Sequence, residues 1–143
     1  SRLLCTHSDF VFAIAPSHPL AAWAGKIPDS ELRRHRAIAV ADTSQELDAR
    51  SIGLLEGQDI LRVPDLRAKA GAQSAGLGIG HLPRWLADPE IAAGRLIEKA
   101  IEGPRPSLPM HIAWRTRHVG RALQWFLDAL WEARHTEALA AGL

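Results

Sequence analysis

Short apolar runs that alternate with helix-spaced segments are the feature that most constrains the fold of this chain. Residues 10–15 form a continuous apolar run that stops at Pro16, which is typical of a parallel strand buried on both faces. Because strands and helices alternate along the whole chain, the sequence predicts an α/β domain with a largely parallel sheet. Further strands are predicted over residues 37–41, 59–63, 78–82, 96–101 and 110–115, and helices over residues 31–35, 64–75, 85–93 and 119–135.

Three glycines, at positions 76, 78 and 80, follow the predicted helix over residues 64–75. A dinucleotide-binding loop needs its glycines after a strand and before a helix, and here that order is reversed. A P-loop needs Lys and then Ser or Thr after its last glycine, where this chain has His81 and Leu82. Ser74 lies within the predicted helix and not on the strand-to-helix turn that exposes a nucleophilic serine. We therefore expect a helix end and a tightly packed strand here, and no catalytic loop.

Composition excludes several classes of function. Seventeen basic and sixteen acidic residues give a net charge of +1, which leaves no electrostatic footprint for nucleic acid or for an anionic membrane. The seven histidines have no partner at metal-ligand spacing, so no metal, cofactor or enzyme activity is expected. A single cysteine cannot form an internal disulfide, and the sequence has no signal peptide or membrane-length apolar run. A soluble, cytoplasmic protein is the expectation.

An ordered series of short motifs resembles the C-terminal effector-binding domain of LysR-type transcriptional regulators. The series comprises His18-Pro19-Leu20, the Gly-x-Gly-x-x-x-x-Pro pattern over residues 76–83, and Ala93-Gly94-Arg95-Leu96. The segments "HIAWR" and "GRALQWFLDAL" resemble the final strand and helix of that family. No single motif is diagnostic, but the series covers residues 9–131.

This resemblance implies a type 2 periplasmic-binding-protein-like α/β fold, in which two subdomains joined by two crossing strands hold a small molecule between them. Residues 1–15 would be the first crossing strand, residues 16–98 a complete Rossmann-like subdomain II, and residues 99–103 the return crossing strand. Residues 104–143 would be the C-terminal part of subdomain I. The rest of subdomain I and the DNA-binding winged helix-turn-helix are expected to be absent from this chain.

The resemblance also implies a function and partners. A small organic metabolite would enter the cleft, shift the two subdomains, and so change how a homo-oligomer, a dimer or tetramer, holds its operator DNA in the bacterial cytoplasm. DNA would be contacted only through the missing N-terminal domain, and no membrane would be involved. The identity of the metabolite, and whether the regulator activates or represses, are not predicted.

Candidate effector contacts come from the ends of the predicted strands. Ligands in α/β sheets lie beyond the carboxyl ends of parallel strands, near helix N-termini. The loop after the strand at residues 37–40 matches one that the family uses for effector contact, and the hydroxyls of Thr43 and Ser44 can donate to a carboxylate. A plain turn or helix cap is the alternative interpretation. The predicted contacts are Ala41, Asp42, Thr43 and Ser44, then Val63 and Pro64 at the next strand-to-helix junction, and Lys99 and Ile101 on the return crossing.

Three other functions stay open at this point. The first is a solute-binding protein of the same fold that serves transport, with a secretion signal upstream. The second is a small hydrolase with Ser74 as its nucleophile. The third is a dimerisation module whose stability no metabolite changes.

Overall fold

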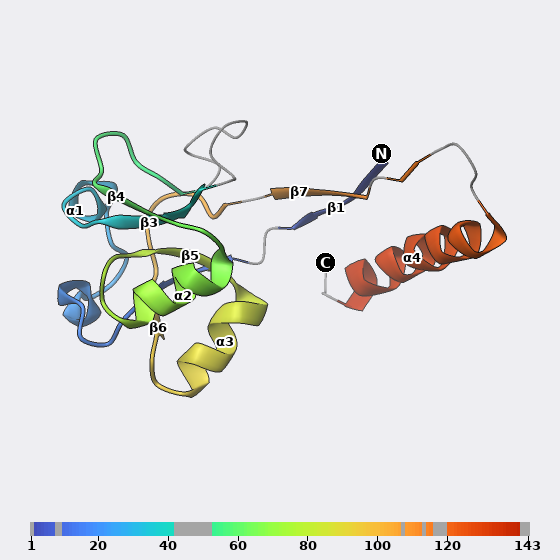
Figure 1. The fold of residues 1–143 in the computed structure, drawn as a ribbon. Helices are drawn as coiled ribbons and strands as arrows, with labels where there is room; N and C mark the ends of the chain where they lie inside the picture. Colours follow the sequence, from blue (N-terminus) through green and yellow to red (C-terminus); the bar gives the residue numbers. More distant parts are fainter. Residues whose placement is uncertain are drawn as a thin grey trace. The chain divides into compact units, whose positions relative to one another are not determined.

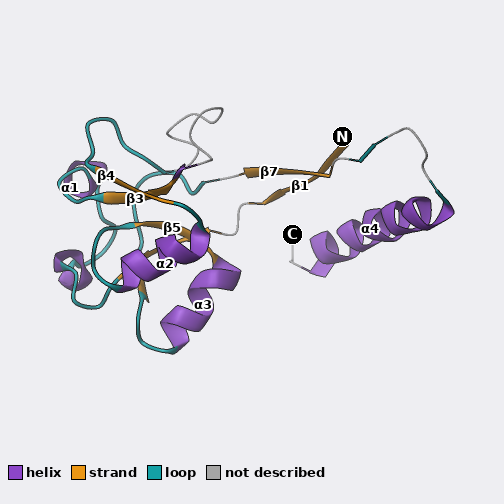
Figure 2. Cartoon of the chain, in the orientation of Figure 1, coloured by secondary structure: helices purple, strands orange, loops and turns teal. Residues whose placement is uncertain are grey.

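The computed structural model describes residues 2–7, 10–41, 53–106, 108–112, 114–115 and 120–140 of the chain (Figure 1). The chain divides into two compact units, one of Ser1–His7 with Leu108–Leu143 and one of Ser8–Ser107. Both units contain strands and helices, as expected for an α/β chain, but β1 and β2, β3 and β4, and β6 and β7 follow one another without a helix between them (Figure 2).

The smaller unit pairs the two distant ends of the chain. Strand β1 (Arg2–His7) pairs antiparallel with β7 (Leu108–Ile112), and the long helix α4 (Arg121–Ala140) contacts β1. This helix begins two residues later and ends five residues later than predicted. Two aromatic side chains near its start, Trp125 and Phe126, are 72% and 51% exposed.

Strand β2 (Phe10–Ile14) is the centre of the larger unit, and every residue in it is buried. It pairs antiparallel with β5 (Gly80–Pro83) on one side and with the short β6 (Ile97–Glu98) on the other. The prediction of a parallel strand here was therefore wrong. Both faces of β2 are buried because a hydrophobic cluster packs on each of them, and an apolar run indicates that burial without revealing strand direction.

Parallel pairing occurs on the other side of β5. Strand β3 (Ala37–Val40) runs parallel to β4 (Ile60–Val63), and a bridge between Ala37 and Ile79 joins β3 to the start of β5. Gly78 makes this junction close, because a Cβ at this position would lie 2.6 Å from the carbonyl oxygen of Arg36. The larger unit thus holds a mixed arrangement of strands, where the sequence had predicted a largely parallel sheet.

Helices α2 (Leu66–Ser74) and α3 (Arg84–Ala92) lie side by side against β2 and β5 (Figure 1). Asp65 caps α2, since its side chain accepts a hydrogen bond of 2.7 Å from the Ala68 amide. The chain leaves α2 through Gly76, whose φ of +75° is the left-handed conformation expected for a glycine after a helix end. The predicted helix over residues 64–75 is confirmed with tighter bounds.

The first two helical segments of the larger unit are short. A 3-10 helix, η1 (Pro19–Ala22), is capped by His18, and α1 (Asp29–Leu32) follows Pro28. The prediction placed a helix over residues 31–35 with Asp29 or Ser30 as its cap. In the structure Pro28 occupies the N-cap position, so the helix begins at Asp29, two residues earlier than predicted.

Alternate residues of β2 supply two separate cores. Val11 and Ala13 pack on the side of α2 and α3, whereas Phe12 and Ile14 pack on the opposite side with Leu20, Ile27, Leu32 and Ile79. Buried Gln73 of α2 donates from Nε2 to the carbonyl oxygens of Ala13 at 2.6 Å and Gly80 at 3.0 Å, so that one side chain ties α2 to two strands. Among the described helices, none has the length and apolar character that crossing a lipid bilayer demands.

Candidate ligand-binding site

A cavity of about 600 Å³ lies within the larger unit, on the face of β2 opposite α3. Phe12 of β2, Ile38 of β3 and Ile79 beside β5 form its apolar floor. Its remaining walls come from α1, from residues 53–58 and from residues 101–104. The volume is within the range of 300–1,000 Å³ that small-molecule sites typically occupy.

Lys69 brings a positive charge to this otherwise apolar floor. It lies on α2 one turn beyond the Asp65 cap, and only 8% of it is exposed. Its aliphatic chain crosses Gly80 closely, because a Cβ at that position would lie 3.1 Å from Lys69 Cε and 3.4 Å from Nζ. Gly80 thus leaves the space through which the lysine reaches the cavity.

His81, the next residue of β5, is the second titratable group of the floor. It is 5% exposed and its ring meets Phe12 edge-on, with 5.3 Å between the ring centroids. A Cβ at Gly53 would lie 2.5 Å from His81 Nδ1, so this loop residue approaches the ring as only glycine can. Neither ring nitrogen has a hydrogen-bond partner among the residues that the structure describes.

Burial sets the charge state of both groups. Desolvation lowers the pKa of Lys69 to about 8, below its ordinary value of 10.5. Desolvation, followed by the positive charges of Lys69 and Arg105, lowers the pKa of His81 to about 4. At neutral pH the lysine is therefore mostly charged and the histidine is neutral.

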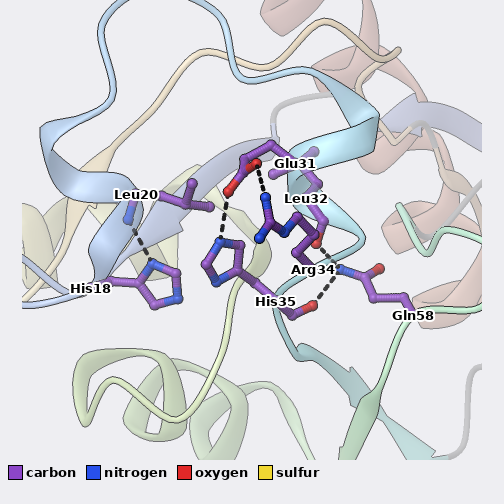
Figure 3. A network of polar contacts seen from close by, with 7 residues as sticks. All are labelled: His18, Leu20, Glu31, Leu32, Arg34, His35 and Gln58. Carbon is purple, nitrogen blue, oxygen red and sulfur yellow. Dashed lines mark hydrogen bonds and ion pairs between the residues drawn. The ribbon is translucent and has the colours of Figure 1, made fainter.

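A polar network holds one wall of the cavity (Figure 3). Gln58 Nε2 donates to the carbonyl oxygens of Leu32 and His35, at 3.0 Å each, and Gln58 Oε1 accepts from the Leu55 amide at 3.3 Å. Gln58, Leu32 and Leu55 all line the cavity, so these bonds fix the loop around residue 55 to the end of α1. On the same helix, Glu31 interacts with His35 at 3.4 Å and with Arg34 at 3.5 Å.

His18 lies beside this network, against His35 (Figure 3). The two rings meet edge-on with their centroids 4.9 Å apart, and His18 Nδ1 accepts from the Leu20 amide at 3.2 Å. Burial, and then the neighbouring His35, lower the pKa of His18. The His18-Pro19-Leu20 motif thus closes a turn, and its histidine has a structural partner.

The predicted contact residues are placed in different ways. Ile101 lines the cavity and forms a parallel bridge with Ile27. Lys99 does not line it, because its Nζ donates to the carbonyl oxygens of Ala21 at 3.2 Å and Trp23 at 2.7 Å. Predicted contacts outside the cavity lining are Ala41 after β3, Val63 at the end of β4 and exposed Pro64, and those outside the described residues are Asp42, Thr43 and Ser44.

Sequence reasoning missed Lys69 and His81. One signal was present: Asp65, Lys69 and Gln73 are spaced by four residues, which places them on one helix face beside apolar Ala70. His81 follows Gly80 within an apolar strand, and the nearby Ile79 and Leu82 are both buried. Both patterns indicate polar side chains that face inward. Sequence alone does not show whether such a side chain contacts a ligand or only supports the fold.

Ser74 has no catalytic setting in this fold. It lies inside α2, and its Oγ is 3.4 Å from Glu90 Oε2 of α3. Glu90 also accepts two hydrogen bonds from Arg95, at 2.6 and 2.9 Å, and these, ahead of other causes, lower the pKa of its carboxyl. Within the described ranges, no group of three or more His, Cys, Asp or Glu residues is placed to hold a metal ion.

Comparisons with known proteins agree on one family. The family model described as LysR substrate binding domain matches residues 1–134. An uncharacterized HTH-type transcriptional regulator, YeeY of Escherichia coli K12, is 38% identical over 120 residues, which are 84% of this chain and 39% of that protein. The HTH-type transcriptional activator AllS of Klebsiella pneumoniae is 37% identical over 101 residues, 71% of this chain and 36% of AllS. This chain thus spans little more than a third of these relatives.

Solved structures agree on the fold. The effector-binding domain of QuiR in complex with shikimate matches with a TM-score of 0.70 and 20% identity, over 94% of this chain and 64% of that one. The regulatory domain of MetR from N. meningitidis matches with a TM-score of 0.68 and 18% identity, over 95% and 63%. The type 2 periplasmic-binding-protein-like fold is therefore confirmed, and the chain belongs to the LysR substrate-binding domain family, the effector-binding domain of LysR-type transcriptional regulators.

Proposed function

We propose that this chain is the metabolite-sensing part of a cytoplasmic bacterial transcription regulator. The observation that carries the proposal is the cavity of about 600 Å³ in a domain whose relatives are named as HTH-type transcriptional regulators. Those names favour regulation over solute transport, the other function compatible with the fold. DNA contact is proposed through a helix-turn-helix segment of the full regulator, since the net charge of +1 gives this chain no overall excess of positive charge.

The proposed mechanism is binding without chemistry. An effector that binds one arrangement of the regulator more tightly than another shifts the equilibrium between them by its difference in binding free energy. The proposed contacts are Ile101, which lines the cavity, the residues after β3, namely Ala41, Asp42, Thr43 and Ser44, and Val63 and Pro64 at the end of β4. Lys99 is proposed as a further contact, and the working unit is a homo-oligomer without a cofactor.

The test is a metabolite screen read by thermal unfolding and then by DNA binding. A ligand present at 100 times its Kd stabilises the folded state by about 2.7 kcal/mol, which raises the Tm by roughly 5–10 °C for a chain of this size. The regulator is expected to change its footprint on its own promoter when the same ligand is added. A metabolite that stabilises the protein without altering any DNA contact would instead favour a solute-binding role. If no class of metabolite changes the Tm, the sensing function is refuted.

A further inference from the structure

Lys69 presents a buried positive charge that nothing described in the structure neutralises. It is 8% exposed, burial alone accounts for its lowered pKa, and its Nζ makes no hydrogen bond to any residue that the structure describes. Burying an ammonium group without a partner is costly, since the charged form loses its hydration. Such a group calls for an anion, and the described residues do not supply one.

Other cations of the larger unit differ from Lys69 in this respect. Arg36 reaches Asp59 at 2.7 Å, and Arg95 bonds Glu90 at 2.6 Å, although the two arginine side chains are 50% and 57% exposed. Carboxylates are thus paired with cations at the surface, where pairing contributes little to stability. The cation inside the cavity is left without one.

His81 provides a second unmet polar group beside the first. Its two ring nitrogens are buried and lack partners among the described residues, and the positive charge of Lys69 acts on the ring. A neutral imidazole carries one N–H donor and one acceptor nitrogen. Because these nitrogens have no accessible surface, the ring makes no contact with a ligand, and Lys69 is the polar group that the floor formed by Phe12, Ile38 and Ile79 presents to the cavity.

We propose that Lys69 Nζ binds the carboxylate of a small monoanionic metabolite, whose apolar body occupies the rest of the cavity. This inference rests on the proposed function and deepens it, because it names the chemical class of the effector and the residue that recognises its charged end.

The charges of the lining favour a monoanion. Besides Lys69 and His81, the charged lining residues are Asp29, Arg33 and Glu56. Asp29 lies in α1, where its Oδ1 would be 3.2 Å from a Cβ on Gly103, and neither acidic group contributes to the lowered pKa of Lys69. Asp29, Glu56 and Arg33 belong to the walls, whereas Lys69 is the positive charge of the floor, so one negative charge on a ligand matches it. A ligand with two negative charges would carry one charge more than Lys69 balances, and Asp29 and Glu56 would repel it.

The first experiment compares two probes of equal shape on the purified protein. Cyclohexanecarboxylate carries the proposed charge, and cyclohexanecarboxamide does not. Calorimetry is expected to give a Kd for the carboxylate at least about 10-fold lower, since hydrogen bonds to a charged group are worth roughly twice as much as neutral ones. Cyclohexyl phosphate, a dianion near neutral pH, tests the charge number and is expected to bind more weakly than the carboxylate.

Two matched variants test the residue. Lys69→Met keeps the aliphatic chain over Gly80 and removes the ammonium group, so it is expected to fold and to weaken carboxylate binding about 10-fold or more. Lys26→Met makes the same change at an exposed lysine and is expected to leave binding unchanged. A thermal melt of each variant confirms folding before its Kd is measured.

A spectroscopic measurement separates recognition from a packing role. The chain has three lysines, Lys26, Lys69 and Lys99, so ¹³C-lysine labelling gives few enough Cε resonances to assign with the two variants. The Cε resonance of Lys69 is expected to titrate with a midpoint near pH 8. The carboxylate is expected to raise this midpoint, and the carboxamide is expected to leave it unchanged. A lysine that only packs over Gly80 would show the same midpoint with either probe.

The outcomes distinguish this inference from the proposed function. If both probes bind equally, if Lys69→Met binds the carboxylate as the unmodified protein does, or if the phosphate binds best, the inference is overturned. A neutral or cationic metabolite that alters both Tm and promoter footprint would overturn the inference and leave the sensing function intact. Absence of any stabilising metabolite would remove both.

Discussion

Gln73 is the polar side chain on which the packing of α2 most depends, and replacing it tests this account of the fold. It is fully buried and donates from Nε2 to the carbonyl oxygens of Ala13 and Gly80 at 2.6 and 3.0 Å. Gln73→Met keeps the volume and removes both bonds, which costs about 1–1.5 kcal/mol each. Loss of the unpartnered Oε1 returns about 1 kcal/mol. The net expectation is a loss of about 1–2 kcal/mol in the free energy of unfolding.

Gln73→Glu distinguishes the two bonds from simple packing. A carboxylate in the same place faces two carbonyl oxygens and has no proton to donate, so its cost is expected to exceed that of methionine by about 2 kcal/mol. Hydrogen exchange of the β2 amides measures the stability of the larger unit. A loss of 1.4 kcal/mol in the free energy of unfolding corresponds to about a 10-fold faster exchange. Gln124→Met, at an exposed position of α4, is the control. Methionine and glutamate variants of equal stability, or both within 0.5 kcal/mol of the unmodified protein, would refute the reasoning.

Four further predictions follow from single positions. Gly71→Ala is expected to raise the free energy of unfolding by about 0.5–1 kcal/mol in urea titration, because a Cβ there meets nothing within 4 Å inside α2. Gly78→Ala is expected to lower it by roughly 1–3 kcal/mol in the same titration, since its Cβ would lie 2.6 Å from the Arg36 carbonyl oxygen; an unchanged midpoint would contradict the β3–β5 junction. Asp65→Ala removes the α2 cap and is expected to cost about 1 kcal/mol, whereas Asp65→Asn keeps most of it. Between pH 8 and 10.5 the unfolded chain holds a proton that folded Lys69 has released, so stability is expected to rise with pH by up to roughly 3 kcal/mol, and Lys69→Met should flatten that rise.

Local patterns predicted the elements well, because each depends on residues close in sequence. The apolar run at residues 37–40 and the Asp65 start and Gly76 end of α2 are local signals, and the structure confirms them. Strand direction was not predictable in this way, because the neighbours of β2 are β5, about 70 residues further along the chain, and β6, about 85 residues further along.

The sequence identified one residue that lines the cavity and missed the two titratable residues of its floor. Ile101 was identified from the return strand, and it does line the cavity. Lys69 was not identified, because the space that it occupies is left by Gly80, which belongs to a strand beyond the end of its own helix. Whether a lysine is covered or solvated depends on the tertiary partner of its helix face, and periodicity within the helix does not report that partner.

Gln73 and Lys69 lie one turn apart on the same face of α2, and their different surroundings support a functional interpretation of the lysine. The amide of Gln73 meets two carbonyl oxygens, so its burial is offset by hydrogen bonds that hold the helix to the strands. The ammonium of Lys69 has no such bond to a described residue, and a methionine would fill the same space over Gly80 without the cost of burying a charge. Packing therefore explains the glutamine but not the charge of the lysine. An anionic ligand in the cavity would supply the missing partner, which is why the comparison of Lys69→Met with Lys26→Met bears on function as well as on stability.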